Sequence, residues 1–216
     1  MKDQLREFLS YVDEYIVNGG HFFWLELSSK LGCPFDISPE DFLKISEKHL
    51  KEKNYIDALA NVKRWIDSQM DMLLFNIWYL DLARKEKWSF PKKVNLFNNF
   101  WILAPRILNK INRCRNELEH SFKHPTSEIV EDYLDIAMLF RWYTEKYLLD
   151  FAYFVTDGGE SGSDWYAISV RQWKINIEFV SQTKDGYRFS IFISDRKKYE
   201  YIIKLLIESL DWLTGG

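Results

Sequence analysis

The spacing of apolar residues changes once along this chain of 216 residues, at a short segment rich in glycine. Before that segment, apolar residues recur every three or four positions, which is typical of amphipathic α-helices. After it they alternate with small or polar residues, which is typical of half-buried β-strands. The segment itself, residues 157–163, has the sequence DGGESGS and indicates a linker. The sequence therefore predicts a mainly α-helical protein that ends in a small α+β element.

The N-terminal half of the chain shows three helical patterns. The first covers residues 1–17 and stops at Asn18-Gly19-Gly20, because glycine favours the left-handed conformation that ends many helices. Its apolar stripe comprises Leu5, Leu9, Val12 and Ile16. The second begins at Ser38-Pro39, where serine can cap free amides and proline fits the first turn. The third and longest, from Tyr55 to Leu80, has one apolar face over about seven turns.

Two further helices are expected after a loop at residues 88–93. The first covers residues 94–122, and Pro105 must kink or divide it because proline lacks the amide donor. His124-Pro125 ends this region, since the residue before a proline disfavours the helical conformation, and the last helix begins at residue 126. The apolar stripe of the last helix comprises Ile129, Tyr133, Ile136, Phe140, Tyr143, Tyr147 and Phe151. Together these helices predict an antiparallel helical bundle.

The pattern beyond the linker predicts a three-strand meander followed by one helix. The first two strands cover residues 166–170 and 175–179, and Asp185-Gly186 is a strong hairpin signal before the third. Ser194-Asp195 then caps the final helix. The expected organisation is an N-terminal helical extension at residues 1–53, a helical bundle at residues 54–156, and the small meander-plus-helix element at residues 164–216.

The charge balance limits how this chain can hold a polyanion. With 29 basic and 32 acidic residues the formal net charge is −3. A protein that holds nucleic acid mainly through phosphates is expected to carry a basic surplus, so any such role must depend on a local site. The aromatic content of 17% argues for bulky cores or a wide aromatic interface, and against disorder.

The remaining composition bears on localisation. Cys33 and Cys114 lie far apart without CxxC spacing, so reduced thiols are expected. The N-terminus is polar at once, unlike a signal peptide, and no window approaches the roughly 20 apolar residues of a membrane helix. We therefore expect a cytoplasmic protein with no membrane-bound part.

One short motif carries recognisable chemistry, and it lies at residues 115–120, RNELEH. An arginine, an asparagine directly after it, and a histidine after four intervening residues form an R-x4-H pattern near a helix end. With the long helix before it and the aromatic-rich helix after it, the region from Asn54 to Val155 resembles the HEPN family ("higher eukaryotes and prokaryotes nucleotide-binding"), whose domains are all helical. The resemblance implies a metal-independent RNA endonuclease of the toxin or host-defence type, acting as a homodimer without cofactor or metal.

The residue types suit cleavage of RNA through its own 2′-hydroxyl. Histidine has a pKa near neutrality, so His120 is the expected general acid/base. Arg115 offers a bidentate fork for phosphate oxygens, and Asn116, four residues before His120, can orient the imidazole. No carboxylate cluster for Mg²⁺ is evident, which agrees with a metal-free mechanism. The expected substrate-binding residues, which extend a small basic patch around the motif, are Arg113, Lys123 and His124.

Helix geometry favours a site shared between two copies of the chain. At about 100° per residue, Arg115 and His120 point roughly 140° apart on one helix. One helix therefore cannot easily aim both side chains at the same phosphate. Two copies related by a twofold axis could each supply part of one cleft.

Two other interpretations of the motif stay open. Relatives that keep the fold without cleaving imply a non-catalytic binding or assembly module, with a protein antitoxin or another protein as partner. The motif can also be a coincidence on a solvated helix end, where Arg115 and Glu119 form a surface ion pair and Lys123-His124 complements the helix dipole. The aromatic stripe of the last helix is more typical of a core or dimer face than of a base-stacking platform.

Overall fold

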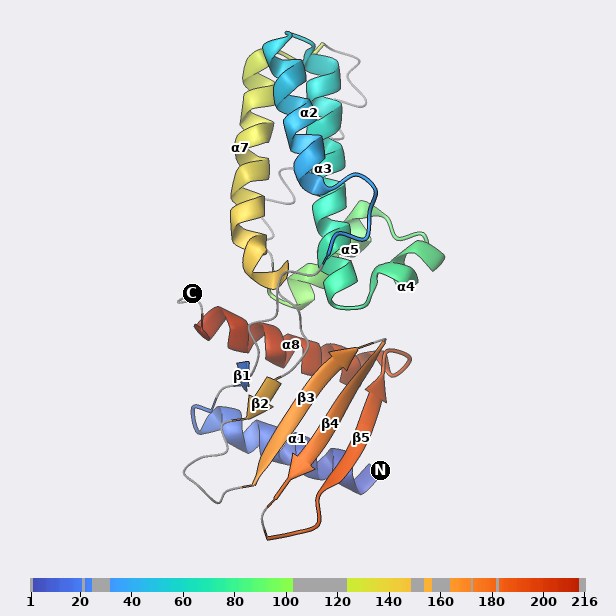
Figure 1. Cartoon of the computed structure of the whole chain (residues 1–216), viewed down its shortest axis with the longest axis vertical. Helices are drawn as coiled ribbons and strands as arrows, with labels where there is room; N and C mark the ends of the chain where they lie inside the picture. Colours follow the sequence, from blue (N-terminus) through green and yellow to red (C-terminus); the bar gives the residue numbers. More distant parts are fainter. Residues whose placement is uncertain are drawn as a thin grey trace. The chain divides into compact units, whose positions relative to one another are not determined.

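The computed structural model describes residues 2–20, 22–24, 32–102, 124–148, 154–156, 164–171, 173–181 and 183–213 (Figure 1). Helices account for most of these residues, so the mainly α-helical prediction is confirmed. The chain divides into two compact units. The helical unit is continuous, Leu31–Leu148, whereas the α/β unit combines Met1–Lys30 with Leu149–Gly216. This division differs from the three consecutive segments expected, because the first helix packs with the C-terminal strands.

The helical unit contains α2 (Pro39–Lys51), α3 (Tyr55–Asn76), α4 (Leu80–Lys85), α5 (Phe90–Asn99), α7 (Ser127–Thr144) and the 3₁₀ turn η1 (Glu145–Leu148). The start of α2 confirms the predicted cap. The Ser38 hydroxyl oxygen accepts from the Asp41 amide at 3.2 Å, and the Asp41 carboxylate accepts from the Ser38 amide at 3.0 Å. This reciprocal capping box fixes where the helix begins. The start of α7 is also confirmed, with Thr126 as its N-cap.

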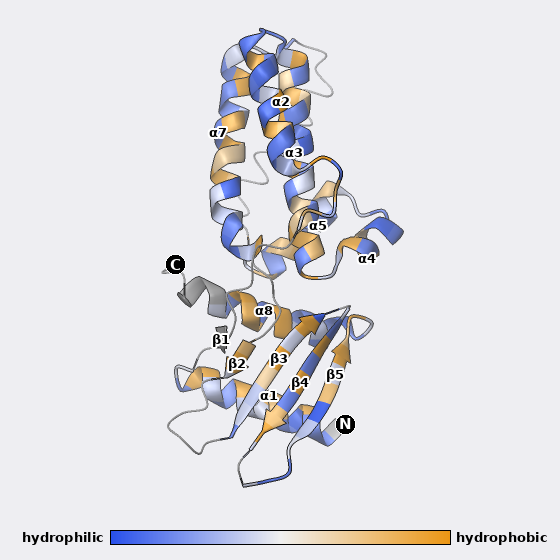
Figure 2. Cartoon of the chain, in the orientation of Figure 1, coloured by the Kyte–Doolittle hydropathy of each residue, from blue (hydrophilic) through white to orange (hydrophobic). Residues whose placement is uncertain are grey.

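The central helix of this unit is α3. Twelve of its 22 residues are buried, which is more than one helix face can supply, so α3 is covered on several sides. On the α2 side, the Ser46 hydroxyl donates to the Ala58 carbonyl at 2.8 Å. On the α7 side, the rings of Trp65 and Phe140 meet edge to face with centroids 5.9 Å apart. Polar residues remain interleaved with the apolar ones along these helices, as amphipathic packing requires (Figure 2).

The directions of α2 and α7 relative to α3 are defined by their contacts. α2 and α3 are antiparallel, as expected for helices joined by a three-residue turn at residues 52–54. In contrast, α7 runs parallel to α3, because Gln69 contacts Thr144 while Asn76, further along α3, contacts Tyr147 in η1 (Figure 1). The chain between α3 and α7 must therefore return to the end at which α3 starts.

The region after α3 differs from the prediction in two respects. The expected loop at residues 88–93 contains the start of α5, because Pro91 occupies its first turn, where proline is well tolerated. Within the helical region expected at residues 94–122, α5 ends at Asn99, because Trp101 adopts a left-handed φ of 62° and closes the last turn. Residues 103–122 of that region lie outside the described residues. The predicted effect of Pro105 lies outside the described residues.

The α/β unit contains α1 (Lys2–Val17), β1 (Phe22–Trp24), β2 (Phe154–Thr156), β3 (Trp165–Arg171), β4 (Lys174–Val180), β5 (Tyr187–Phe192) and α8 (Arg196–Leu213). The strands form one antiparallel sheet in the order β1-β2-β3-β4-β5. The predicted meander is confirmed as β3, β4 and β5. The pattern did not predict β1 and β2, because three residues are too few to show a period.

One face of this sheet forms the core of the unit. The register aligns Ile168 with Ile177 and Ile177 with Phe189, and all three side chains are buried. Both α1 and α8 lie on the same side of the sheet (Figure 1). The ring of Phe8 in α1 meets the ring of Tyr166 edge to face at 5.0 Å. We call the opposite face, on which most residues are half-buried or exposed, the outer face.

The packing of α1 corrects the predicted stripe. The buried residues are Phe8 and Val12, whereas Leu5 and Leu9 are half-buried and Ile16 is exposed. The contact face is thus rotated toward the aromatic side chains, because these rings fill the space above the sheet.

The hairpin between β4 and β5 contains Asp185-Gly186, as predicted. A Cβ atom built on Gly186 would lie 2.9 Å from the Phe179 carbonyl oxygen, closer than ordinary packing allows. Glycine is therefore required here by the close approach of the backbone.

Candidate functional site

Five of the six predicted site residues lie outside the described residues: Arg113, Arg115, Asn116, His120 and Lys123. The sixth, His124, is exposed and precedes α7 without belonging to it. Its neighbour Pro125 is buried, and Thr126 caps the helix with its hydroxyl oxygen 3.4 Å from the Ile129 amide. The predicted helix boundary at His124-Pro125 agrees with the start of α7. Whether the motif residues meet in one site stays a prediction.

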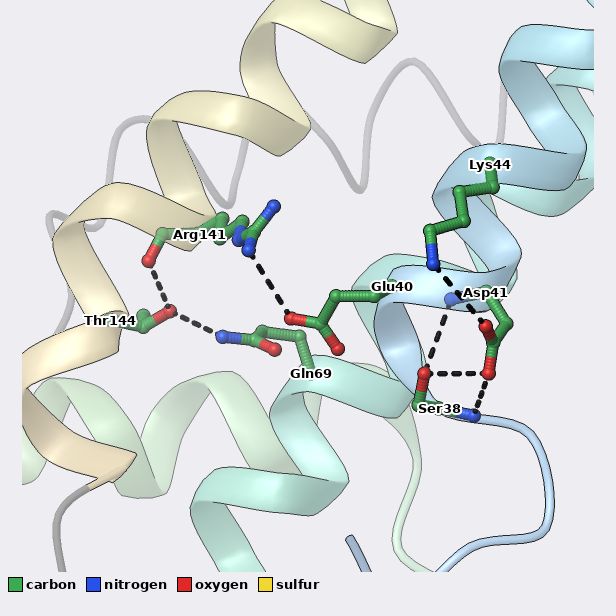
Figure 3. Close-up of polar contacts among 7 residues, drawn as sticks. All are labelled: Ser38, Glu40, Asp41, Lys44, Gln69, Arg141 and Thr144. Atoms are coloured by element: carbon green, nitrogen blue, oxygen red, sulfur yellow. Dashed lines mark hydrogen bonds and ion pairs between the residues drawn. The ribbon is translucent and has the colours of Figure 1, made fainter. Parts of the chain in front are cut away.

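The described residues do show how α7, the helix that follows the motif, is held against α3. The Gln69 side-chain amide donates to the Thr144 hydroxyl oxygen at 2.9 Å (Figure 3). Thr144 donates in turn to the Phe140 carbonyl at 2.7 Å. Nearer the end of α3, the Asn76 side chain donates to the Tyr147 carbonyl at 2.5 Å. Because Gln69, Asn76 and Thr144 are all buried, these bonds set the register between α3 and α7.

A partly exposed ion pair links α7 to α2. The Arg141 guanidinium lies 3.6 Å from the Glu40 carboxylate, as Figure 3 shows beside the Gln69–Thr144 bond. Both side chains are more than one-third exposed to solvent, so the pair contributes little to stability. It does place one cation and one carboxylate at the start of α2.

The ionisable side chain of Asp41, at the start of α2, has a structural role. Hydrogen bonds from the Ser38 hydroxyl and the Ser38 amide hold the pKa of Asp41 below its usual range, so this carboxyl stays ionised at neutral pH. Lys44 adds a weaker contact at 3.9 Å. An amide and a hydroxyl, such as those of Gln69 and Thr144, cannot exchange protons near neutrality. The contacts of Asp41, Gln69 and Thr144 therefore position helices.

These positioning residues were not recognised from the sequence, although a signal exists. Gln69 and Asn76 are seven residues apart within the long apolar pattern, so they share one side of α3. Polar residues repeated on a buried side must find hydrogen-bond partners on a neighbouring helix. The pattern does not say which helix provides them.

Two further features concern the part of the chain that the structure describes. That part contains no group of three histidine, cysteine, aspartate or glutamate side chains able to hold a metal ion. None of its helices combines the length and apolar character needed to span a bilayer. Of the two cysteines, Cys33 is an exposed free thiol and Cys114 lies outside the described residues.

Comparison of the chain with protein-family models, with curated proteins and with solved structures found no match. The class of protein is therefore inferred from its own residues and geometry.

Proposed function

We propose that this protein is a metal-independent RNA endonuclease of the toxin or host-defence type, with Arg115, Asn116 and His120 as its site. The proposal rests on one observation, the R-x4-H motif at residues 115–120, and the resemblance of that region to HEPN domains. It is supported by the helical unit, in which α7 begins seven residues after His120 and follows a proline-containing turn. A homodimer that brings two copies of the motif together is part of the proposal.

In the proposed reaction, His120 removes the proton from a ribose 2′-hydroxyl, whose oxygen then attacks the adjacent phosphorus. The bond to the 5′-oxygen of the next nucleotide breaks, and that oxygen takes up a proton. The products are a 2′,3′-cyclic phosphate and a 5′-hydroxyl. Arg115 stabilises the charge that develops on the phosphate oxygens, and Asn116 holds the imidazole in position.

The net charge of −3 requires that positive charge be concentrated near the motif. Arg113, Lys123 and His124 supply it in this proposal, and the exposure of His124 leaves it accessible to a phosphate. Because such contacts neutralise only a few phosphates, affinity should fall with rising salt concentration.

The test is cleavage of single-stranded RNA by the purified chain in the presence of EDTA. We expect cleavage with cyclic-phosphate ends, and a loss of at least about 100-fold in rate for His120→Ala. His49→Gln is the matched control, because His49 lies in α2 beside Glu52 and is outside the motif. If neither protein cleaves, or if His120→Ala cleaves as fast as the wild type, the proposal is wrong.

A second candidate, a non-catalytic HEPN-like assembly module, is favoured by a different observation. Met138, Leu139 and Trp142 lie within about one turn of α7 and expose 46%, 57% and 78% of their surface. Adjacent exposed apolar side chains often mark a protein–protein contact. This candidate expects an oligomer that Trp142→Ser weakens in light scattering, and no RNA cleavage. A growth arrest that depends on His120 would contradict it.

A further inference from the structure

One corner of the α/β unit gathers basic and aromatic residues. It lies where β3 turns into β4, β5 ends and α8 begins (Figure 1). The Ile193 amide donates to the Trp173 carbonyl at 2.8 Å, which ties the two turns together. The residues of this basic–aromatic corner are Arg171, Trp173, Lys174, Phe192, Arg196 and Lys197.

Three of these residues form a row across the outer face of the sheet. The register pairs Arg171 with Lys174 and Lys174 with Phe192. Their neighbours on the inner face, such as Ile175 and Ile191, are buried, so alternation directs the row to the outer face. Residues directly opposite on adjacent strands lie about 5 Å apart at their Cβ atoms. Two cations and an aromatic ring therefore stand side by side.

Three cations of this corner, Arg171, Lys174 and Lys197, are not balanced locally. Among the described residues, no ion pair joins Arg171, Lys174 or Lys197 to an acidic side chain. The nearby carboxylate of Asp195 pairs instead with Lys198 at 2.6 Å.

Elsewhere on this sheet, basic residues do have acidic partners. Arg188 lies 2.5 Å from Glu178 on the outer face, and Lys184 lies 3.2 Å from Asp164 near the other end of the strands. The corner is thus the place on this sheet where positive charge accumulates.

Stability alone does not account for these residues. The first turn of α8 begins Arg196-Lys197-Lys198 and contains no acidic residue, although a helix N-terminus favours negative charge. Trp173 adopts a φ of 64°, a strained conformation for a residue with a bulky side chain, and exposes 48% of its surface. Phe192 exposes 56%. An anionic ligand with flat rings would offset the unfavourable charge at the start of α8 and would cover the exposed rings of Trp173 and Phe192.

We propose that the basic–aromatic corner binds a single-stranded nucleic acid. Arg171, Lys174 and Lys197 would contact phosphates, while Trp173 and Phe192 would stack on bases. Single-stranded chains suit this surface because their bases are free to stack on exposed rings.

The next row of the outer face adds polar groups. The Asn176 side chain lies between Ser169 and Ser190, 3.4 Å from the first hydroxyl and 2.8 Å from the second. A sheet face with hydrogen-bonding groups beside the rings fits base edges better than it fits lipid tails. The inference does not depend on cleavage by the helical unit, and it would give an RNA substrate a second point of attachment.

The test measures binding of labelled oligouridylate to the full chain by fluorescence anisotropy, in a His120→Ala background that prevents cleavage. We expect Arg171→Gln with Lys174→Gln to weaken binding at least about tenfold and to reduce the logarithmic salt slope by about 1.4. Phe192→Ala should weaken binding about fivefold or more. The matched control, Lys184→Gln with Arg188→Gln, removes two charges from the same sheet outside the corner and should change binding by less than about twofold.

Three results would overturn the inference. The first is no binding by the parent protein, and the second is equal loss in the corner and control variants. The third is binding to vesicles that contain phosphatidylserine without binding to oligouridylate, which would identify a membrane surface instead.

Oligodeoxythymidylate should bind comparably to oligouridylate, since neither stacking nor phosphate contact requires the 2′-hydroxyl. Thermal unfolding of each variant checks that the sheet is intact.

Discussion

The buried hydrogen bond between Gln69 and Thr144 allows a quantitative test of how α7 is held against α3. Gln69 exposes 2% of its surface and Thr144 none, so water cannot replace a lost partner. Thr144→Val removes the hydroxyl with little change in shape and leaves the Gln69 amide without its acceptor. Leaving a buried donor unsatisfied costs about 1–3 kcal/mol.

Gln69→Leu, which removes the other partner of this bond, should lower the free energy of unfolding by less. In Gln69→Leu the Thr144 hydroxyl still donates to the Phe140 carbonyl at 2.7 Å, so only an acceptor position is lost. We expect Gln69→Leu to lower the free energy of unfolding by about 1 kcal/mol. The double variant replaces both partners by apolar groups of similar size and should lie near the wild type, which gives a coupling of about 2–4 kcal/mol.

Hydrogen exchange read by mass spectrometry can measure these differences in the full chain. Thr144→Val should raise the exchange of α7 and α3 amides about 5- to 150-fold, while peptides from β4 serve as an internal control. If the double variant lowers the free energy of unfolding by the sum of the two single effects, the two side chains are not coupled and the assigned role of the bond is wrong.

Three further predictions concern other features of the fold. Gly186→Ala should lower the free energy of unfolding of the α/β unit by about 1–3 kcal/mol in urea, whereas Gly32→Ala, with no atom within 4 Å of the added Cβ, should not destabilise. Burial, and a hydrogen bond to Asp13, raise the pKa of Tyr201 to about 12. Because this pKa exceeds the usual 10, the stability that the Tyr201 hydroxyl contributes is complete below pH 10 and is lost as pH rises through 12. Over that pH range the melting temperature of Tyr201→Phe should therefore fall less than that of the wild type. Lys53→Gly should stabilise the helical unit by about 1 kcal/mol in urea unfolding, since Lys53 has a φ of 59°, while Glu47→Gly inside α2 should destabilise it.

Opposite outcomes would contradict each argument separately. Equal effects of the two glycine replacements by alanine would show that the backbone near Gly186 relaxes freely. Identical alkaline profiles of the wild type and Tyr201→Phe would remove the role assigned to the Tyr201 hydroxyl. A loss of stability in Lys53→Gly would mean that the left-handed turn after α2 carries no strain.

The accuracy of the sequence-based expectations follows from the range of the interactions involved. The starts of α2 and α7 are local, because a capping side chain acts within four residues, and both were predicted at Ser38 and Thr126. The end of α5 at Asn99 was not predicted, because tryptophan, here Trp101, is not a typical residue for the left-handed position after a helix. The rotated face of α1 was also missed, since Phe8 is buried by strands far along the chain.

For the candidate site, the sequence alone supplied the motif residues Arg115, Asn116 and His120, because their chemistry and spacing are properties of a short segment. It also determined the two hydrophobic periods, and with them the helical bundle and the meander. Only the tertiary structure showed that α1 joins the C-terminal sheet, that α7 runs parallel to α3, and that Arg171, Lys174 and Phe192 form one row. The physical reason is that periodicity and caps depend on neighbours along the chain, whereas these arrangements depend on which surfaces are buried together across long separations.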